Sequence, residues 1–257
     1  MPPRLRLLVR EAPCAPPAAA LSTAVGGRYS YQYVYMVEVR YPERRRNRIQ
    51  RGLAEGTMHA DATGVAARAT SGADTRARIL AAASELFYAH GIRAVSADRI
   101  IEQVGITKVT FYRHFRTKSD LLVAYLEQQA AAERQWMESI RRAGDPAGSL
   151  RTLATDIGAA SCSPGFRGCA FINAAAEFSD PDDPVRGAVD AHRRWMLGLF
   201  AELAMEAGVQ NIDATARQLM ILRDGGMVNG YLGDSAALAD TLGAAFTAIL
   251  APAAATG

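Results

Sequence analysis

The sequence predicts an all-α fold, and three observations support this prediction. From Asp74 onward, apolar residues recur at spacings of three and four, which is the period of an amphipathic helix. Stretches rich in Gly, Pro and Asp separate these periodic segments and would end helices. The alternation typical of a strand occurs only in the Tyr-rich segment 29–41, where a lone strand would have no partner.

The periodic segments set the expected order of elements along the 257 residues. Four helices are expected first, at 74–90, 96–104, 107–115 and 118–142. Five more are expected at about 148–161, 168–178, 184–207, 213–232 and 235–250. Asp74, Ser96 and Thr107 are residue types that cap helix starts, and each stands at the start of one of the first three helices.

Two short helices joined by a turn at Gly105-Ile106 follow a longer first helix, which is the order of a helix-turn-helix. In the third helix, Phe111 and Phe115 share one face and are expected in the core, while Tyr112 points outward. The expected core of this domain is Ile79, Leu86, Phe87, Ile100, Val104, Phe111 and Phe115.

Charge is unevenly distributed along the chain. Residues 1–72 carry 11 Lys and Arg against 5 Asp and Glu, and residues 73–120 carry 8 against 5. Residues 121–257 carry 10 against 16. A basic front and an acidic remainder indicate that one end of the protein meets a polyanion.

The segments "ILAAASELFYAHG" and "TKVTFYRHFRTKSDLL" resemble the DNA-binding region of the TetR (tetracycline-repressor-like) family of transcriptional regulators. The resemblance implies a homodimer that represses transcription at palindromic double-stranded DNA and releases it when a small-molecule effector binds. It implies DNA-binding roles for Ser96, Thr107, Lys108, Val109, Thr110, Tyr112, Arg113, His114 and Lys118. Val109 departs from the small residue that the family often has there, so the operator sequence cannot be transferred from relatives.

Three domains follow from these patterns. Residues 1–72 are expected to be a disordered basic extension, 73–120 the helix-turn-helix domain, and 121–257 a helical effector-binding and dimerisation domain. Met58 lies at the usual arm length before the first helix, so translation is expected to start there, or else at Met36. The upstream codons, such as those of "YQYVYMV", could then encode an inverted repeat in leader DNA; the alternative is a genuine basic arm that contacts phosphates.

The helical bundle could hold an apolar ligand pocket between its helices. Candidate lining residues, for each of which plain core packing is the alternative, are Trp136, Phe166, Phe171, Asn173, Phe178, His192, Trp195, Met196 and Met220. Small residues near the C-terminus permit close helix approach, and the resemblance implies that this region forms the dimer interface. The residues concerned are Gly225, Gly226, Gly230, Gly243 and Ala244.

Other classes of function fit the sequence less well. No catalytic or metal-ligand spacing occurs among the four scattered histidines, so no enzyme activity, cofactor or metal is expected. No apolar run is long enough for a membrane span, and the three cysteines do not form a disulfide framework, so the cytoplasm is the expected location. A redox sensor that uses Cys162 and Cys169 remains an alternative, as does an activator.

Overall fold

The computed structural model describes residues 72–233 and 235–251, and every regular element within these ranges is a helix, which confirms the predicted fold class. The helices are α3 (Gly72–His90), α4 (Ala97–Val104), α5 (Lys108–His114), α6 (Lys118–Ile140), α7 (Pro146–Ser161), α8 (Ala170–Glu177), α9 (Pro184–Glu206), α10 (Ile212–Leu232) and α11 (Leu238–Leu250). None of these helices is both long and apolar enough to cross a membrane. The predictions of a disordered basic extension, a start at Met58 and an inverted repeat concern residues outside the described ones.

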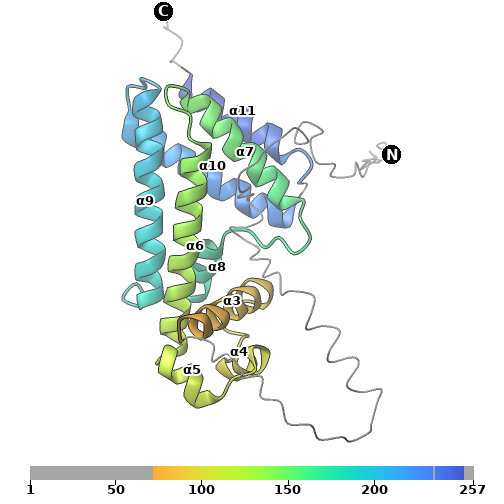
Figure 1. Ribbon diagram of the computed structural model, residues 1–257. Helices are drawn as coiled ribbons and strands as arrows, with labels where there is room; N and C mark the ends of the chain where they lie inside the picture. Colours follow the sequence, from red (N-terminus) through yellow and green to blue (C-terminus); the bar gives the residue numbers. More distant parts are fainter. Residues whose placement is uncertain (1–71, 234, 252–257) are drawn as a thin grey trace, which may run out of the picture.

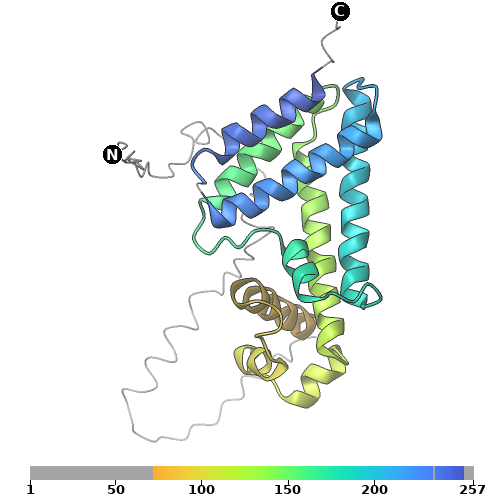
Figure 2. The same ribbon diagram turned by 180° about the vertical axis from the view of Figure 1, so that it is seen from behind.

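The molecule has two parts, which Figures 1 and 2 show from opposite sides. Helices α3, α4 and α5 form a small head, and helices α6 to α11 form a larger body. Helix α6 begins beside the head and runs the length of the body next to α9, while α7, α10 and α11 lie at the far end. Helix α6 is therefore the element that extends from the head into the body.

The helix starts of the head use side-chain caps. The Ser96 hydroxyl accepts from the backbone N–H of Arg99 at 3.2 Å, and the Thr107 hydroxyl accepts from Thr110 at 3.1 Å. The first helix departs from prediction, because α3 begins at Gly72 and Asp74 lies within its first turn instead of capping it. The Asp74 carboxylate still lies near the positive end of the helix dipole, which favours a negative charge there.

The turn between α4 and α5 depends on Gly105. Its φ is +71°, in the left-handed region where a side chain is strained, and its N–H donates to the carbonyls of Ile101 and Glu102. This cap ends α4 abruptly, so that α5 can start three residues later.

Small residues let the helices of the body approach closely. A Cβ added at Gly158 of α7 would lie 2.6 Å from the Cβ of Ala239, and one at Gly230 of α10 would lie 2.7 Å from the Cβ of Ser161. Gly226 is also buried, and a Cβ there would lie 2.9 Å from Leu242. These glycines serve close packing within one chain, and the part of Gly226 and Gly230 in a dimer interface stays a prediction.

We expect Gly230→Ala to lower the free energy of unfolding by about 1–3 kcal/mol, because its methyl group overpacks the contact with α7. The control is Gly198→Ala in the middle of α9, where an added Cβ meets nothing within 4 Å. That change should stabilise by about 0.5–1 kcal/mol through helix propensity. Urea unfolding of both variants measures the difference, and equal effects would contradict the close packing of α10 on α7.

Candidate nucleic-acid interface and body interior

Helix α5 has one buried face and one exposed face. The Phe111 and Phe115 side chains are buried, and all the other predicted core residues of the head are buried with them. Val109 and Tyr112 lie on the opposite side, 78% and 47% exposed. The Tyr112 ring packs edge-on against Phe111 with centroids 5.2 Å apart, but about half of Tyr112 and most of Val109 remain in water, so this face is available for contact with another molecule.

The basic residues of α5 share the exposed side. Arg113 is exposed, and the Lys108 ammonium lies 2.8 Å from the Asp98 carboxylate of α4. The hydrogen bond to Asp98 raises the pKa of Lys108 above its ordinary value. An ion pair this exposed contributes little to stability, so a phosphate group could readily take the place of Asp98.

Several of the predicted DNA-binding residues also have roles in the head itself. The Thr107 hydroxyl caps α5 and lies 3.0 Å from the Thr110 hydroxyl. Lys118 donates from Nζ to the Ile92 carbonyl at 2.6 Å, and burial lowers its pKa. A phosphate contact by Lys118 would therefore compete with a bond that holds the head to the start of α6.

His114 and Ser96 differ in their access to a ligand. Ser96 is exposed beside its cap contact. His114 is half-buried, and its Nε2 atom is covered and has no hydrogen-bond partner among the described residues. The His114 ring is therefore turned partly towards the protein, which leaves it less accessible to DNA than the exposed Ser96.

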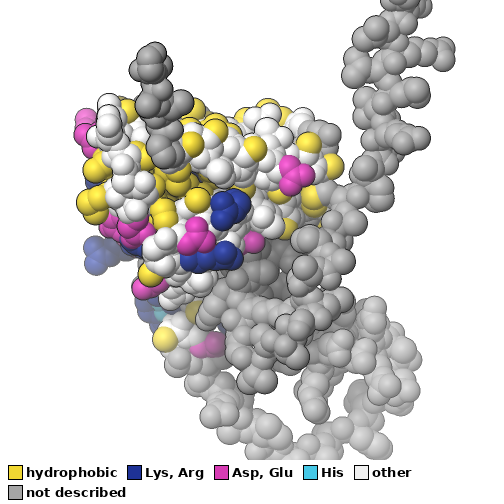
Figure 3. All heavy atoms as spheres, turned by 90° about the horizontal axis from the view of Figure 1, so that it is seen from above, with side chains coloured by type: hydrophobic (Ala, Val, Ile, Leu, Met, Phe, Trp, Pro, Cys, Tyr) yellow, Lys and Arg dark blue, Asp and Glu magenta, His cyan; other side chains and the backbone are white. Residues whose placement is uncertain are grey.

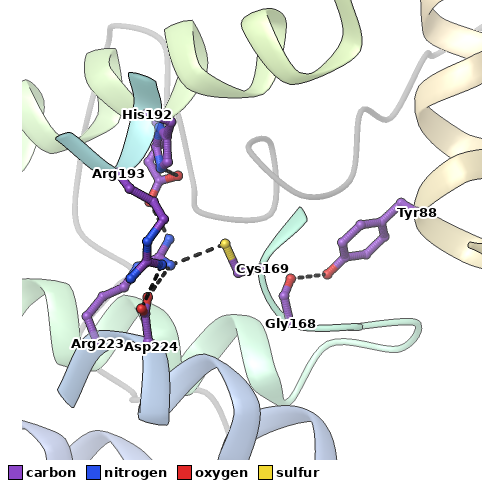
Figure 4. A network of polar contacts seen from close by, with 8 residues as sticks. Tyr88, Gly168, Cys169, His192, Arg193, Arg223 and Asp224 are labelled. Atoms are coloured by element: carbon purple, nitrogen blue, oxygen red, sulfur yellow. Dashed lines mark hydrogen bonds and ion pairs between the residues drawn. The ribbon is translucent and has the colours of Figure 1, made fainter. Parts of the chain in front are cut away.

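The body interior contains a buried polar cluster of Glu133, His192 and Arg223, the last two of which are labelled in Figure 4. The Arg223 guanidinium lies 2.6 Å and the His192 Nε2 atom 3.2 Å from the Glu133 carboxylate, and all three side chains are at most 2% exposed. Burial alone would raise the pKa of Glu133, but the charge of Arg223 and the nearby His192 ring hold it well below its usual value. The cluster therefore joins α6, α9 and α10 through an ionised carboxylate.

Several residues of the predicted ligand pocket surround this cluster. The Phe171 ring stacks on the His192 ring with centroids 3.6 Å apart, and Trp195 lies 5.5 Å from His192. Residues that are buried in the core are Trp136, Phe166, Phe171, His192, Met196 and Met220. Trp195 also lines a groove between α6 and α9.

Two of the predicted pocket residues lie elsewhere. Phe178 packs under the guanidinium of Arg93 in the head, 5.8 Å from its ring centroid. Asn173 lines a separate cavity between head and body. The structure therefore does not bring all nine predicted residues around one cavity.

Glu133 and Arg223 were missed by sequence reasoning, although the sequence carries a signal for both. Glu133 lies seven residues after Leu126, on the same buried face of α6. Arg223 lies four residues after Leu219 and four before Met227, which are both buried. A charge at an apolar position of each of two helices indicates a buried pair, because a lone charge there would be costly.

A second set of polar contacts joins head and body. The Tyr88 hydroxyl at the end of α3 donates to the Gly168 carbonyl at 3.1 Å and accepts from the Arg167 N–H at 2.9 Å. The Glu177 carboxylate accepts from the backbone N–H groups of Ile92 and Arg93 at 2.9 and 2.7 Å. We call these contacts the joint; all of them run between the head and the segment formed by α8 and the loop before it.

Gly168 lies where the joint meets the body interior. Its φ is +74°, and a Cβ there would lie 3.1 Å from the Met227 carbonyl of α10. The next residue, Cys169, has a buried free thiol 3.2 Å from Arg223 Nη1 (Figure 4). Because Cys169 is free, it is not bonded to Cys162. The consecutive residues Gly168 and Cys169 thus connect the joint to the buried polar cluster.

The head, with an exposed basic recognition helix on a buried two-helix support, defines a helix-turn-helix DNA-binding regulator. The family model for bacterial regulatory proteins of the tetR family matches residues 79–125. The chain belongs to the TetR family of transcriptional regulators, whose members act on transcription and are not enzymes.

The comparisons that show the family extend over most of the described residues. A TetR-family regulator from Streptomyces coelicolor, SCO4454, has a crystal structure that is 40% identical, with a TM-score of 0.64, over 69% of this chain and 95% of that one. The transcriptional repressor NemR of Escherichia coli is 28% identical over 141 residues, which are 54% of this chain and 70% of NemR. The transcriptional activator FasR of Mycolicibacterium smegmatis is 36% identical over 55 residues, 21% of this chain and 25% of FasR.

We expect Arg223→Met to lower the free energy of unfolding at pH 7 by about 3–5 kcal/mol, because it leaves the buried Glu133 carboxylate without its cation. Arg193→Met is the matched control, since Arg193 pairs with Asp224 at 2.8 Å but is 39% exposed. Its loss should cost less than about 1 kcal/mol. Chemical denaturation measures both, and a small effect of Arg223→Met would show that the cluster does not stabilise the body.

Proposed function

We propose that the protein is a homodimeric repressor that binds palindromic DNA in the cytoplasm and releases it when a small molecule binds the body. The observation that carries the proposal is the exposed face of α5, where Tyr112, Arg113 and Lys108 surround Val109 above a buried Phe111. A solvated helix face has no need of Val109 and Tyr112, whereas a thymine methyl group and the sugar–phosphate backbone can contact both. The relatives NemR and SCO4454 are regulators by name, which supports the same proposal.

In the proposed complex, the N-terminal tip of α5 enters the major groove first. Thr107 and Lys108 lie at this tip, where free backbone N–H groups also favour phosphate. Tyr112 and Arg113 follow one turn later and reach the backbone or base edges. Ser96 and Lys118 are proposed to contact phosphates on either side, at the starts of α4 and α6.

The proposed dimer forms through α10 and α11. Ile221, Gly225, Val228 and Leu232 recur along α10 at spacings of four, three and four, so they share one face, and the three large side chains are at least 41% exposed. Ala244 of α11 is exposed as well, whereas Gly243 is half-buried against Ala154. An apolar stripe of this kind marks a surface that another chain covers.

A two-fold axis through these helices would match the symmetry of palindromic DNA. The two α5 helices would then lie about 34–36 Å apart, one turn of the double helix. Seen from the end opposite the head, hydrophobic and uncharged side chains cover much of the described body, with charged groups scattered among them (Figure 3). An effector would release DNA by moving α6 and with it the head, which changes this spacing.

The two alternatives have less support. A redox switch that uses Cys162 and Cys169 would need access to Cys169, which is 2% exposed beside Arg223. An activator would use the same DNA-binding head, and the likeness to the activator FasR covers only a fifth of this chain. Thiol titration of the native protein with and without peroxide, followed by a DNA-binding measurement, separates the redox alternative from release by a ligand.

We expect Tyr112→Ala and Arg113→Ala each to weaken DNA binding by about 1–3 kcal/mol, because both side chains lie on the exposed face of α5. The DNA is a site selected from random sequence by the full chain, and fluorescence anisotropy measures the affinity at physiological salt. Arg151→Ala removes the same charge from α7 in the body and should leave the affinity unchanged. Equal affinities for all three variants and the wild type would refute the assignment of α5 as the DNA-binding helix.

We expect the wild-type protein to sediment as a dimer at micromolar concentration and the double variant Ile221→Asp/Val228→Asp as a monomer. The two carboxylates would be buried without partners in the proposed interface, whereas in the monomer they remain in water. Met205→Asp places the same charge on another exposed hydrophobic residue, 61% exposed, at the end of α9, and should leave the dimer intact. A wild-type monomer that binds a palindrome with full affinity would rule the dimer out.

A further inference from the structure

A cavity of about 200 Å³ lies at the joint between head and body. Its walls come from the end of α3 and the turn after it, from α6, and from α8 with the loop before it. Aromatic side chains of Phe87, Tyr88 and Tyr125 contribute to the lining. A protein cavity of roughly 150 Å³ can hold benzene, so this one has room for a single ring with a small substituent.

Tyr125 is the residue that gives this cavity a chemical preference. Its side chain is 2% exposed, lines the cavity and packs edge-on to Phe87 at 5.7 Å, yet its hydroxyl makes no hydrogen bond within the described residues. Burial raises the pKa of Tyr125 far above its ordinary value, with smaller contributions from Tyr88 and Cys169, so the group is a protonated donor at neutral pH. Buried hydroxyl groups normally have a partner, and here an occupant of the cavity can supply one.

The other polar groups of the cavity are largely occupied by the joint. Both Glu177 oxygens accept backbone N–H groups, and the Arg167 guanidinium donates to the Ala89 carbonyl at 2.9 Å. The Asn173 amide nitrogen donates to the Arg167 carbonyl at 2.9 Å, while its oxygen accepts no bond within the described part of the chain. The one carboxylate and the one guanidinium balance each other, which favours an uncharged ligand.

We propose that this cavity binds a neutral, single-ring aromatic molecule whose carbonyl oxygen accepts from the Tyr125 hydroxyl and whose N–H or O–H donates to Asn173. The inference deepens the proposed function, because it gives the effector a site and a chemical class. An occupant would touch the end of α3 and α8 at once, between the two elements that the joint holds together. A ligand that fits only one arrangement of these elements shifts the molecule towards that arrangement and changes the position of the head.

Benzamide is the probe, since it has one ring, no charge, an acceptor oxygen and a donor nitrogen. Isothermal titration calorimetry with the full chain should give a Kd of about 1 mM or below, the range of a small fragment. Tyr125→Phe removes only the hydroxyl and should weaken benzamide binding about tenfold while leaving benzene binding unchanged. Tyr231→Phe removes an exposed hydroxyl in α10 and should change neither.

A second variant tests the position of the site. Ala176 is exposed and lines the cavity, so Ala176→Phe should cover it without disturbing the core and abolish binding of both probes. The melting temperature of Tyr125→Phe without ligand should equal or exceed that of the wild type, because the hydroxyl makes no bond to lose. A large drop would mean that the hydroxyl already has a partner and would overturn the proposal, as would full benzamide affinity in Tyr125→Phe and Ala176→Phe, or no binding to the wild type.

The regulatory part is tested by DNA affinity. Saturating benzamide should change the affinity of the wild type for its selected DNA site at least fivefold and that of Ala176→Phe not at all. Binding without any such change would refute a role as an effector site. If the proposed function is wrong, the wild type binds no DNA with or without benzamide. Calorimetry would still show in that case whether the cavity binds benzamide.

Discussion

The buried ion pair between Glu133 and Arg223 fixes how α6 and α10 meet inside the body. Both side chains are withdrawn from water, so each needs the other at a fixed place, and small shifts of α6 along α10 would be costly. His192 extends the constraint to α9 through the same carboxylate. Because α6 continues without a break to Lys118 beneath the head, the register set deep in the body also sets where the head begins.

The joint depends on this constraint. Gly168 and Cys169 follow each other in the chain, one bonded to Tyr88 of the head and the other in contact with Arg223. A shift of Arg223 would therefore displace Cys169 and Gly168, and through the bond to Tyr88 it would reach the end of α3. Glu177, the last residue of α8, adds a second attachment, so the head is bonded both to the loop before α8 and to the C-terminal end of α8.

The parts of the structure that the sequence predicted are those that depend on neighbours along the chain. Helix periods, the Ser96 and Thr107 caps and the two faces of α5 follow from spacings of three and four, and all are confirmed. The joint escaped prediction because Tyr88 and Gly168 are 80 residues apart and Ile92 and Glu177 are 85 residues apart, and no local pattern links them. The glycines of α10 showed the limit most clearly: their spacing predicts a close contact, but does not say whether the partner is another chain or, as at Gly230, the same one.

Glycine at position 168 has a consequence for anyone who would build hybrid regulators from this protein. Its carbonyl accepts from Tyr88 of the head, and a side chain there would be strained by the left-handed φ and would lie close to the Met227 carbonyl of α10. A head transplanted from a relative would keep its own fold but lose its fit to this loop unless its first helix ended in a tyrosine at the position of Tyr88. A hybrid with a new DNA specificity would therefore need more than a junction at the start of α6. Residues 167–177 would have to be exchanged together with the head.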